Sequence, residues 1–263
     1  MNFIAIAGVI TVRILYSYYF QKQPTPITFL SREDVIQFFR KDPDHYFDSF
    51  NDINLRGFGY DDKQTMIDDA CRSARSFSQK EQDYITKKCI EADQFLTQFN
   101  DVPYFPSKKV AKIKWNFAKT FGRLYEKGFP HTRLSIIFLT DRFVFHKDLV
   151  QLLVHEKIHL FSRLYPVDMR RWMDKNGYTL YKKISDYPLA KLNPDNDGMV
   201  YLDKNEKELV LQFNSPFPLS FDDINCSISG TSEVDCSSKE HPNEVLAYKI
   251  DSYVAKYLEH FHS

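Results

Sequence analysis

The sequence predicts an α+β fold that is mainly helical and contains a small sheet. Apolar residues recur with a helical period through much of the N-terminal half, and a further helical stretch surrounds residues 152–161. Residues 134–140, Leu-Ser-Ile-Ile-Phe-Leu-Thr, are short and rich in β-branched and aromatic side chains, which is typical of a strand. A length of 263 residues suits one domain, or a domain with a helical subdomain.

The N-terminal half is predicted to consist of helices. A short amphipathic helix is expected to begin at Ser31, and residues 63–99 are interpreted as two helices with Ser78 as the N-cap between them. Residues 107–126 carry apolar side chains at helical spacing and predict another helix. We expect these helices to pack as a layer against the C-terminal part of the chain.

Residues 1–22 are interpreted as a membrane anchor because residues 3–20 are almost entirely apolar. About twenty apolar residues span a bilayer, whereas Arg13 near the centre costs roughly 2.5–3.5 kcal/mol. A buried amphipathic helix is the alternative. Lys22 and Arg32 follow the segment, so the positive-inside rule places the remaining protein in the cytosol. We expect residues 25–128 to form a helical subdomain and residues 129–263 to carry the chemistry.

The most informative motif is His-Glu-Lys-Ile-His at residues 155–159. Positions i and i+4 of a helix share one face, so His155 and His159 can offer imidazole nitrogens to one metal ion. Glu156 would lie at the edge of that face, within reach of a water at the ion. Asp148 is expected to cap or charge the first turn, and Pro166 to end the helix.

The motif also has a simpler interpretation. Chance produces such a pattern in roughly one comparable sequence in a hundred. The two histidines would then belong to a core helix in which hydrogen bonds satisfy their rings. We favour the metal site because buried polar side chains are costly in an apolar helix unless they have partners.

A catalytic zinc site needs a third protein ligand, and Glu244 is the best candidate. His241 is expected to be the N-cap of a second helix and Pro242 its first residue, which places Glu244 in the first turn. The small side chain of Ala247 would allow this helix to approach the first one closely. The alternative is that Glu244 only interacts favourably with the helix dipole.

H-E-x-x-H followed by a later helix with E-x-x-A resembles the gluzincin zinc metallopeptidases, whose third ligand is a glutamate. The resemblance covers roughly residues 130–260 and matches His155, Glu156, His159, Glu244 and Ala247. It implies a zincin-like fold, with a small sheet beside the motif helix. It also implies zinc (Zn²⁺) held by the two histidines and Glu244, Glu156 as general base, and a peptide or protein substrate.

The chain departs from the gluzincin pattern in two places. The gap between His159 and Glu244 is long (244 − 159 = 85 positions), so a sizeable insertion is expected between the two helices. Tyr248 stands where many gluzincins have an Asp, and Asp251, one turn further on, could orient a metal-bound histidine instead.

The expected chemistry is amide hydrolysis. Zinc held by two neutral imidazoles and a carboxylate keeps strong Lewis acidity. Glu156 would take a proton from the attacking water and pass it to the leaving amine. The oxyanion needs a further donor, and the sequence does not choose among Tyr178, Tyr181 and Tyr201. In similar peptidases, a strand placed like residues 134–140 is the sheet edge that binds an extended substrate; an ordinary core strand is the alternative.

The segment between the two metal helices is predicted to be irregular. Residues 193–198, Asn-Pro-Asp-Asn-Asp-Gly, are interpreted as a solvated turn and not as a calcium loop, because the closing Glu is missing. Residues 199–202 and 209–213 are expected to be strands, and a hairpin is one way for them to pair. His131 and His146 are further candidate ligands, but each is more typical of a surface or capping histidine.

Composition excludes some functions and leaves two alternatives. The 35 basic and 35 acidic residues give a formal net charge of +0, which argues against a nucleic-acid-binding protein. The alternatives to a metallopeptidase are a non-catalytic zinc-binding module of the same fold and a zinc hydrolase that acts on a non-peptide bond. Glu156 argues against the first, because a structural zinc site has no use for a general base.

Overall fold

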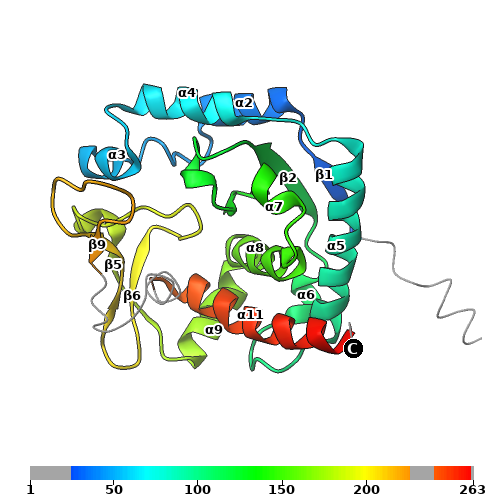
Figure 1. Ribbon diagram of the computed structural model, residues 1–263. Helices are drawn as coiled ribbons and strands as arrows, with labels where there is room; N and C mark the ends of the chain where they lie inside the picture. The colour runs from blue at the N-terminus through cyan, green and yellow to red at the C-terminus, as the bar shows by residue number, and fades with distance from the viewer. Residues whose placement is uncertain (1–24, 226–239, 262–263) are drawn as a thin grey trace, which may run out of the picture.

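The computed structural model describes residues 25–225 and 240–261, and it confirms a mainly helical protein with small sheets (Figure 1). The N-terminal half contains α2 (Arg32–Lys41), α3 (Asp52–Phe58), α4 (Lys63–Ser73), α5 (Gln79–Gln98) and α6 (Ser107–Val110). Capping boxes at Ser31 and Ser78 begin α2 and α5, as predicted, because each hydroxyl accepts a hydrogen bond from the N3 backbone N–H.

The central sheet contains β1 (Ile27–Phe29), β2 (Trp115–Thr120), β3 (His131–Arg133) and β4 (Ile136–Thr140). Their order is β1-β2-β4-β3, in which β3 alone runs antiparallel to its neighbour within this sheet. The chain reaches the edge strand through a short 3₁₀ turn, η1 (Glu126–Gly128).

The prediction of a helix over residues 107–126 holds only for α6 and is wrong for the residues after it. Trp115–Thr120 forms an interior strand, β2, which pairs with β1 on one side and with β4 on the other. Its apolar side chains are buried on both faces: Phe117 packs into one core and Ala118 into the other. An interior strand is apolar on both faces, and here its apolar positions happened to match a helical period.

Helices cover both faces of this sheet. In Figure 1, α2 and α4 lie across one face, while α5 and the central α8 (Leu149–Leu164) lie on the other. The core on the α5 and α8 side includes residues from Phe77 to Val254. The sheet takes β1 and β2 from residues 25–128 and β3 and β4 from residues 129–263. The division expected near residue 128 therefore runs through a continuous sheet and a shared core.

The remaining helices are α7 (Asp141–Val144), α9 (Pro166–Lys175) and α11 (Pro242–Phe261). As predicted, α8 ends before Pro166, which opens α9. Asp148 occupies the N-cap position of α8, but its side chain makes no cap hydrogen bond, so of the two expected roles only its charge beside the first turn remains. Helix α11 packs along α8 with Ala247 fully buried, as its small side chain predicted.

Two small sheets lie beside these helices. They contain β5 (Thr179–Lys183), β6 (Met199–Leu202), β7 (Glu208–Leu209), β8 (Gln212–Phe213) and β9 (Ile224–Asn225). Strands β6 and β7 form the expected antiparallel hairpin, but the strand predicted for residues 209–213 is divided between β7 and β8, which lie in different sheets. A 3₁₀ turn, η2 (Ile184–Asp186), follows β5. No helix in the described parts of the chain is both long and apolar enough to cross a membrane. The anchor expected in residues 1–22, at residues 3–20, lies outside them and stays a prediction.

Candidate metal centre

Helix α8 carries the motif into the interior of the protein. His159 is fully buried, Glu156 is 2% exposed, and the side chain of His155 is 14% exposed. The helix is apolar around the motif because it packs against α5 on one side and α11 on another. The two imidazole rings are neighbours on one face, with centroids 4.9 Å apart, as the i, i+4 spacing predicts.

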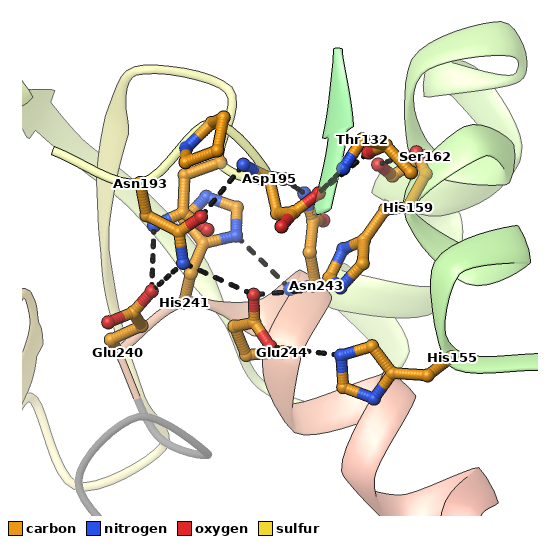
Figure 2. Close-up of polar contacts among 12 residues, drawn as sticks. Thr132, His155, His159, Ser162, Asn193, Asp195, Glu240, His241, Asn243 and Glu244 are labelled. Atoms are coloured by element: carbon orange, nitrogen blue, oxygen red, sulfur yellow. Dashed lines mark hydrogen bonds and ion pairs between the residues drawn. The ribbon is translucent and has the colours of Figure 1, made fainter. Parts of the chain in front are cut away.

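Glu244 lies opposite the two histidines, in the first turn of α11 (Figure 2). Its Oε2 is 3.5 Å from His155 Nε2, and its Oε1 is 3.6 Å from His159 Nε2. One ligand atom from each of the three residues lies within 4.8 Å of the others. Ligands about 2.0–2.1 Å from a tetrahedral ion stand roughly 3.3–3.4 Å apart. The three side chains therefore fit a metal ion with little rearrangement.

The protonation of the two histidines differs. Burial lowers the pKa of His159 to about 3, so its ring is neutral and can bind a metal. Burial would also lower the pKa of His155, but hydrogen bonds to Asp251 and Glu244 outweigh it and raise that pKa. Both ring nitrogens of His159 are buried without a hydrogen-bond partner in the described residues. Such atoms are rare in folded proteins, and an ion between the rings would satisfy Nε2.

Asp251 orients the first histidine. Its Oδ2 lies 2.9 Å from His155 Nδ1, so Nδ1 carries the hydrogen and Nε2 faces Glu244. Asp251 is two turns beyond Glu244 on α11, and its contact with His155 agrees with the orienting role that the sequence suggested for it. A carboxylate behind a metal-binding histidine fixes its tautomer and its ring orientation.

A polar network holds Glu244 from the other side. Helix α11 begins at Pro242, as predicted, and His241 Nδ1 accepts a hydrogen bond of 3.1 Å from the backbone N–H of Asn243. Asn193 donates its side-chain amide to Glu240 and, at 3.4 Å, to Glu244 Oε1. Burial, and then the charge of Glu244, raise the pKa of Glu240 to about 7.

The prediction of a solvated turn at residues 193–198 is wrong for its central residue. Asp195 is 6% exposed, and its carboxylate accepts hydrogen bonds from the N–H (2.8 Å) and the hydroxyl (2.6 Å) of Thr132. Figure 2 shows this loop beside Glu244 and His159. Turn-forming residues were identified correctly, but their contacts with β3 and α11 are long-range and leave no local sequence signal.

The predicted edge strand needs a correction. Residues 136–140 form β4, which is interior, and β3 is the edge beside the metal ligands. The outward-facing backbone of β3 is already bonded, because the N–H of Thr132 donates to Asp195 and its C=O accepts from Arg163 at 3.1 Å. An extended peptide therefore finds no free hydrogen-bonding groups at Thr132.

The structure leaves both extra histidines outside the ligand group. His131 is buried, and not on the surface as expected; its Nδ1 faces the carbonyl of Phe129 at 3.0 Å and its ring stacks on Phe138. Burial lowers the pKa of His131 to about 4. The side chain of His146 is 42% exposed, in line with a surface histidine.

A cleft of about 540 Å³ opens beside the ligand group. Its lining includes His155, Glu156, Glu244 and Asp251 at one end and Glu126 with Lys191 elsewhere. Glu156 Oε2 is buried and has no hydrogen-bond partner within the described chain. Burial, followed by the charge of Asp195, raises the pKa of Glu156 well above its usual range.

The tyrosine candidates from the sequence do not reach this cleft. Among the described residues that line it, the one tyrosine is Tyr248, whereas Tyr178, Tyr181 and Tyr201 lie elsewhere. The hydroxyl of Tyr201 donates to Asp197 at 2.7 Å. Tyr248 follows Glu244 by one helical turn, so the i, i+4 spacing on α11 would have found it. No local signal would have found Asn193 or Asp195.

Comparison of the chain with protein-family models, with curated proteins and with solved structures finds no match.

Proposed function

We propose that the protein is a zinc-dependent metallopeptidase of the gluzincin type. The observation that carries this proposal is one arrangement: three ligand atoms converge within 4.8 Å, and Glu156, whose Oε2 has no partner among the described residues, lines the same open cleft. Glu156 follows His155 directly in the sequence, so one helix supplies both a metal ligand and the base beside it.

The donor set favours zinc. Two imidazoles and one carboxylate, with a position left for water or substrate, are typical of catalytic zinc sites. Structural zinc sites usually have four protein ligands, whereas the group found in the described residues has three. When bound, zinc would supply Lewis acidity towards a water and a carbonyl oxygen.

The chain itself would supply binding, orientation and proton transfer. Asp251 holds His155 in the tautomer that leaves Nε2 free for the metal. Glu156 takes the proton of the attacking water and gives it to the leaving amine. Its raised pKa suits the second half of this task, and a nearby dication would lower that pKa enough for the first half.

A non-catalytic zinc module explains Glu156 less well. Its Oε2 is buried without a hydrogen-bond partner among the described residues, and a buried polar atom of this kind costs stability. A protein that only bound zinc would gain stability by replacing Glu156 with an apolar residue. Its presence at the end of a cleft is better explained by chemistry than by folding.

A zinc hydrolase that acts on a non-peptide bond is the second candidate, and the edge of β3 favours it. Extended peptides commonly bind such sites by adding a strand. At Thr132, Asp195 and Arg163 already occupy the groups that such a strand would use. An ester or amide that does not require strand addition would avoid this obstacle.

The decisive test compares wild type with Glu156→Gln. We expect both to bind one equivalent of zinc, measured by metal analysis, and the variant to hydrolyse a fluorogenic peptide library about 10²–10⁴-fold more slowly. Glu259→Gln on the exposed side of α11 is the matched control and should keep full activity. Full activity of Glu156→Gln would reject the mechanism. Wild-type cleavage of aryl esters, with no cleavage of the peptide library, would favour the second candidate.

A further inference from the structure

We propose that Tyr248 is a catalytic residue that donates a hydrogen bond from its phenolic hydroxyl to the oxyanion formed on the substrate carbonyl. This inference rests on the hydrolase function proposed above and names a residue for a role that the motif leaves open. Acyl transfer places negative charge on the carbonyl oxygen, and preorganised donors that stabilise this charge contribute strongly to catalysis.

Two other donors near the cleft are already committed. The side-chain amide of Asn193 donates to Glu240 and Glu244. The guanidinium of Arg163 donates to the backbone carbonyls of Thr132 and Pro194. Each of these groups therefore holds the scaffold of the site in place and is not available to a reacting oxygen.

Two further polar residues of the cleft lining, His131 and Lys191, also fit the role poorly. His131 has its Nδ1 at the carbonyl of Phe129, so its Nε2 is an acceptor in the neutral ring. The ammonium of Lys191 lies 3.5 Å from the centroid of the Phe221 ring, in a cation–π contact. A donor for the oxyanion has to lie close to the metal ligands.

Tyr248 meets the positional requirement. It lines the cleft, and its ring packs edge-on against the ring of His155, with centroids 4.9 Å apart. It lies one turn after Glu244 on the same helix, so it is anchored on the element that supplies a ligand. Its hydroxyl has no hydrogen bond to any other described residue. A phenol keeps its proton at neutral pH and therefore acts as a donor.

The proposed step is balanced without a further reactant. A bond forms between the water oxygen and the carbonyl carbon, the carbonyl π electrons move to the oxygen, and Glu156 takes the water proton. Tyr248 stabilises the resulting charge and keeps its own proton. Collapse re-forms the carbonyl and breaks the C–N bond, and Glu156 protonates the leaving amine.

The test is Tyr248→Phe, which removes one oxygen atom and keeps the ring against His155. We expect unchanged zinc content, a kcat lower by about 10²–10³ and little change in KM. Calorimetry with two probes gives a readout independent of turnover. A phosphinic pseudopeptide, which carries the oxyanion, should lose affinity by a similar factor, whereas a thiol pseudopeptide, which carries none, should bind as tightly as before.

The matched control is Tyr178→Phe, at a half-buried tyrosine that stacks on Trp172 outside the cleft. It should behave as wild type in every assay. An unchanged kcat of Tyr248→Phe, or equal losses of affinity for both probes, would overturn the proposal. If circular dichroism shows that Tyr248→Phe does not fold, Tyr248→His is titrated with the same two probes. Equal losses of affinity for both probes in that variant would also overturn the proposal.

The two proposals fail in different ways. Loss of hydrolysis in Glu156→Gln together with full kcat in Tyr248→Phe would reject only the role of Tyr248. Hydrolysis by Glu156→Gln at the wild-type rate would reject the proposed function itself, whatever the result for Tyr248.

Discussion

The Oδ2 atom of Asp251 lies 2.9 Å from Nδ1 of His155, on the side of the ring away from Glu244. This contact joins the two helices that supply the metal ligands, α8 and α11. It fixes the ring so that Nε2 points to the ligand group. Sequence spacing had suggested Asp251 for this role, and the contact confirms that it can orient the histidine.

Replacing Asp251 with Asn should weaken metal binding. The amide can keep a hydrogen bond to His155, but it removes the negative charge that strengthens the imidazole as a ligand. We expect zinc affinity to fall about 10–100-fold, measured by competition with a chelator. Asp174→Asn, at an exposed position on α9, is the control and should not change the affinity. Equal affinities of Asp251→Asn and wild type would show that the contact does not serve the metal.

Glu244 and Glu240 provide a second, internally controlled prediction. Both side chains are buried, and the two residues are close together in the sequence. Glu244 groups with the histidines, whereas Glu240 accepts a hydrogen bond from Asn193. Replacing a residue that only supports a ligand typically lowers metal affinity about 10–100-fold. We expect Glu244→Gln, which changes a ligand itself, to lower the zinc affinity by more than this. Glu240→Gln should keep one equivalent of zinc by metal analysis. The reverse ranking would mean that the third ligand is misassigned.

The motif helix is also held by a buried lysine. Lys157 is fully buried and forms an ion pair with Asp93 on α5; its Nζ donates to the carbonyl of Ala111 at 3.1 Å and lies 3.8 Å over the ring of Trp115. These contacts tie α8 to α5, α6 and β2. The variable position within H-E-x-x-H therefore fixes the helix in the core.

Lys157→Met should destabilise the fold, because it leaves the partly buried carboxylate of Asp93 without its charged partner. We expect a loss of about 3–5 kcal/mol in the free energy of unfolding, measured by urea denaturation. The double variant Asp93→Leu, Lys157→Met removes both charges and should lose less than the single variant. A double variant that is less stable than Lys157→Met would show that the charge pair is not the source of the effect.

The features that the sequence predicted correctly depend on neighbours within a few residues. Ser31 and Ser78 cap helices through contacts three residues away. His155 and His159 share a face because of the helical repeat alone. Glu244 was found by combining a local helix start at Pro242 with the need of a catalytic metal for a third ligand.

The features that were missed depend on contacts far along the chain. Trp115–Thr120 became a strand because β4, about twenty residues later, pairs with it, and this pairing outweighed the helical period of its apolar residues. Asp195 is buried because it bonds to Thr132, 63 positions earlier. Nothing near Asp195 in the sequence distinguishes this role from that of a solvated turn.

Glu126, which also lines the cleft, gives the structure a pH-dependent element. It is 7% exposed, and its Oε1 accepts a hydrogen bond of 3.0 Å from the hydroxyl of Tyr46. Burial raises the pKa of Glu126 from its ordinary value of 4.5 to about 7, although the hydrogen bond from Tyr46 opposes the shift. The folded protein therefore favours the protonated carboxyl group.

The sign of the pH effect on stability follows from this raised pKa. Between pH 4.5 and about 7 the folded state holds a proton on Glu126 that the unfolded state has released, so this group's contribution to stability is lost as the pH rises. Glu126→Gln cannot ionise, so we expect it to match wild type near pH 4 and to exceed it by roughly 3 kcal/mol above pH 7. Urea denaturation across this range measures the difference. The control is Glu206→Gln. Glu206 has a positive φ, as Glu126 does, but it is exposed, so this variant should show no such trend. A Glu126→Gln difference that does not change with pH would contradict the buried, protonated carboxyl group.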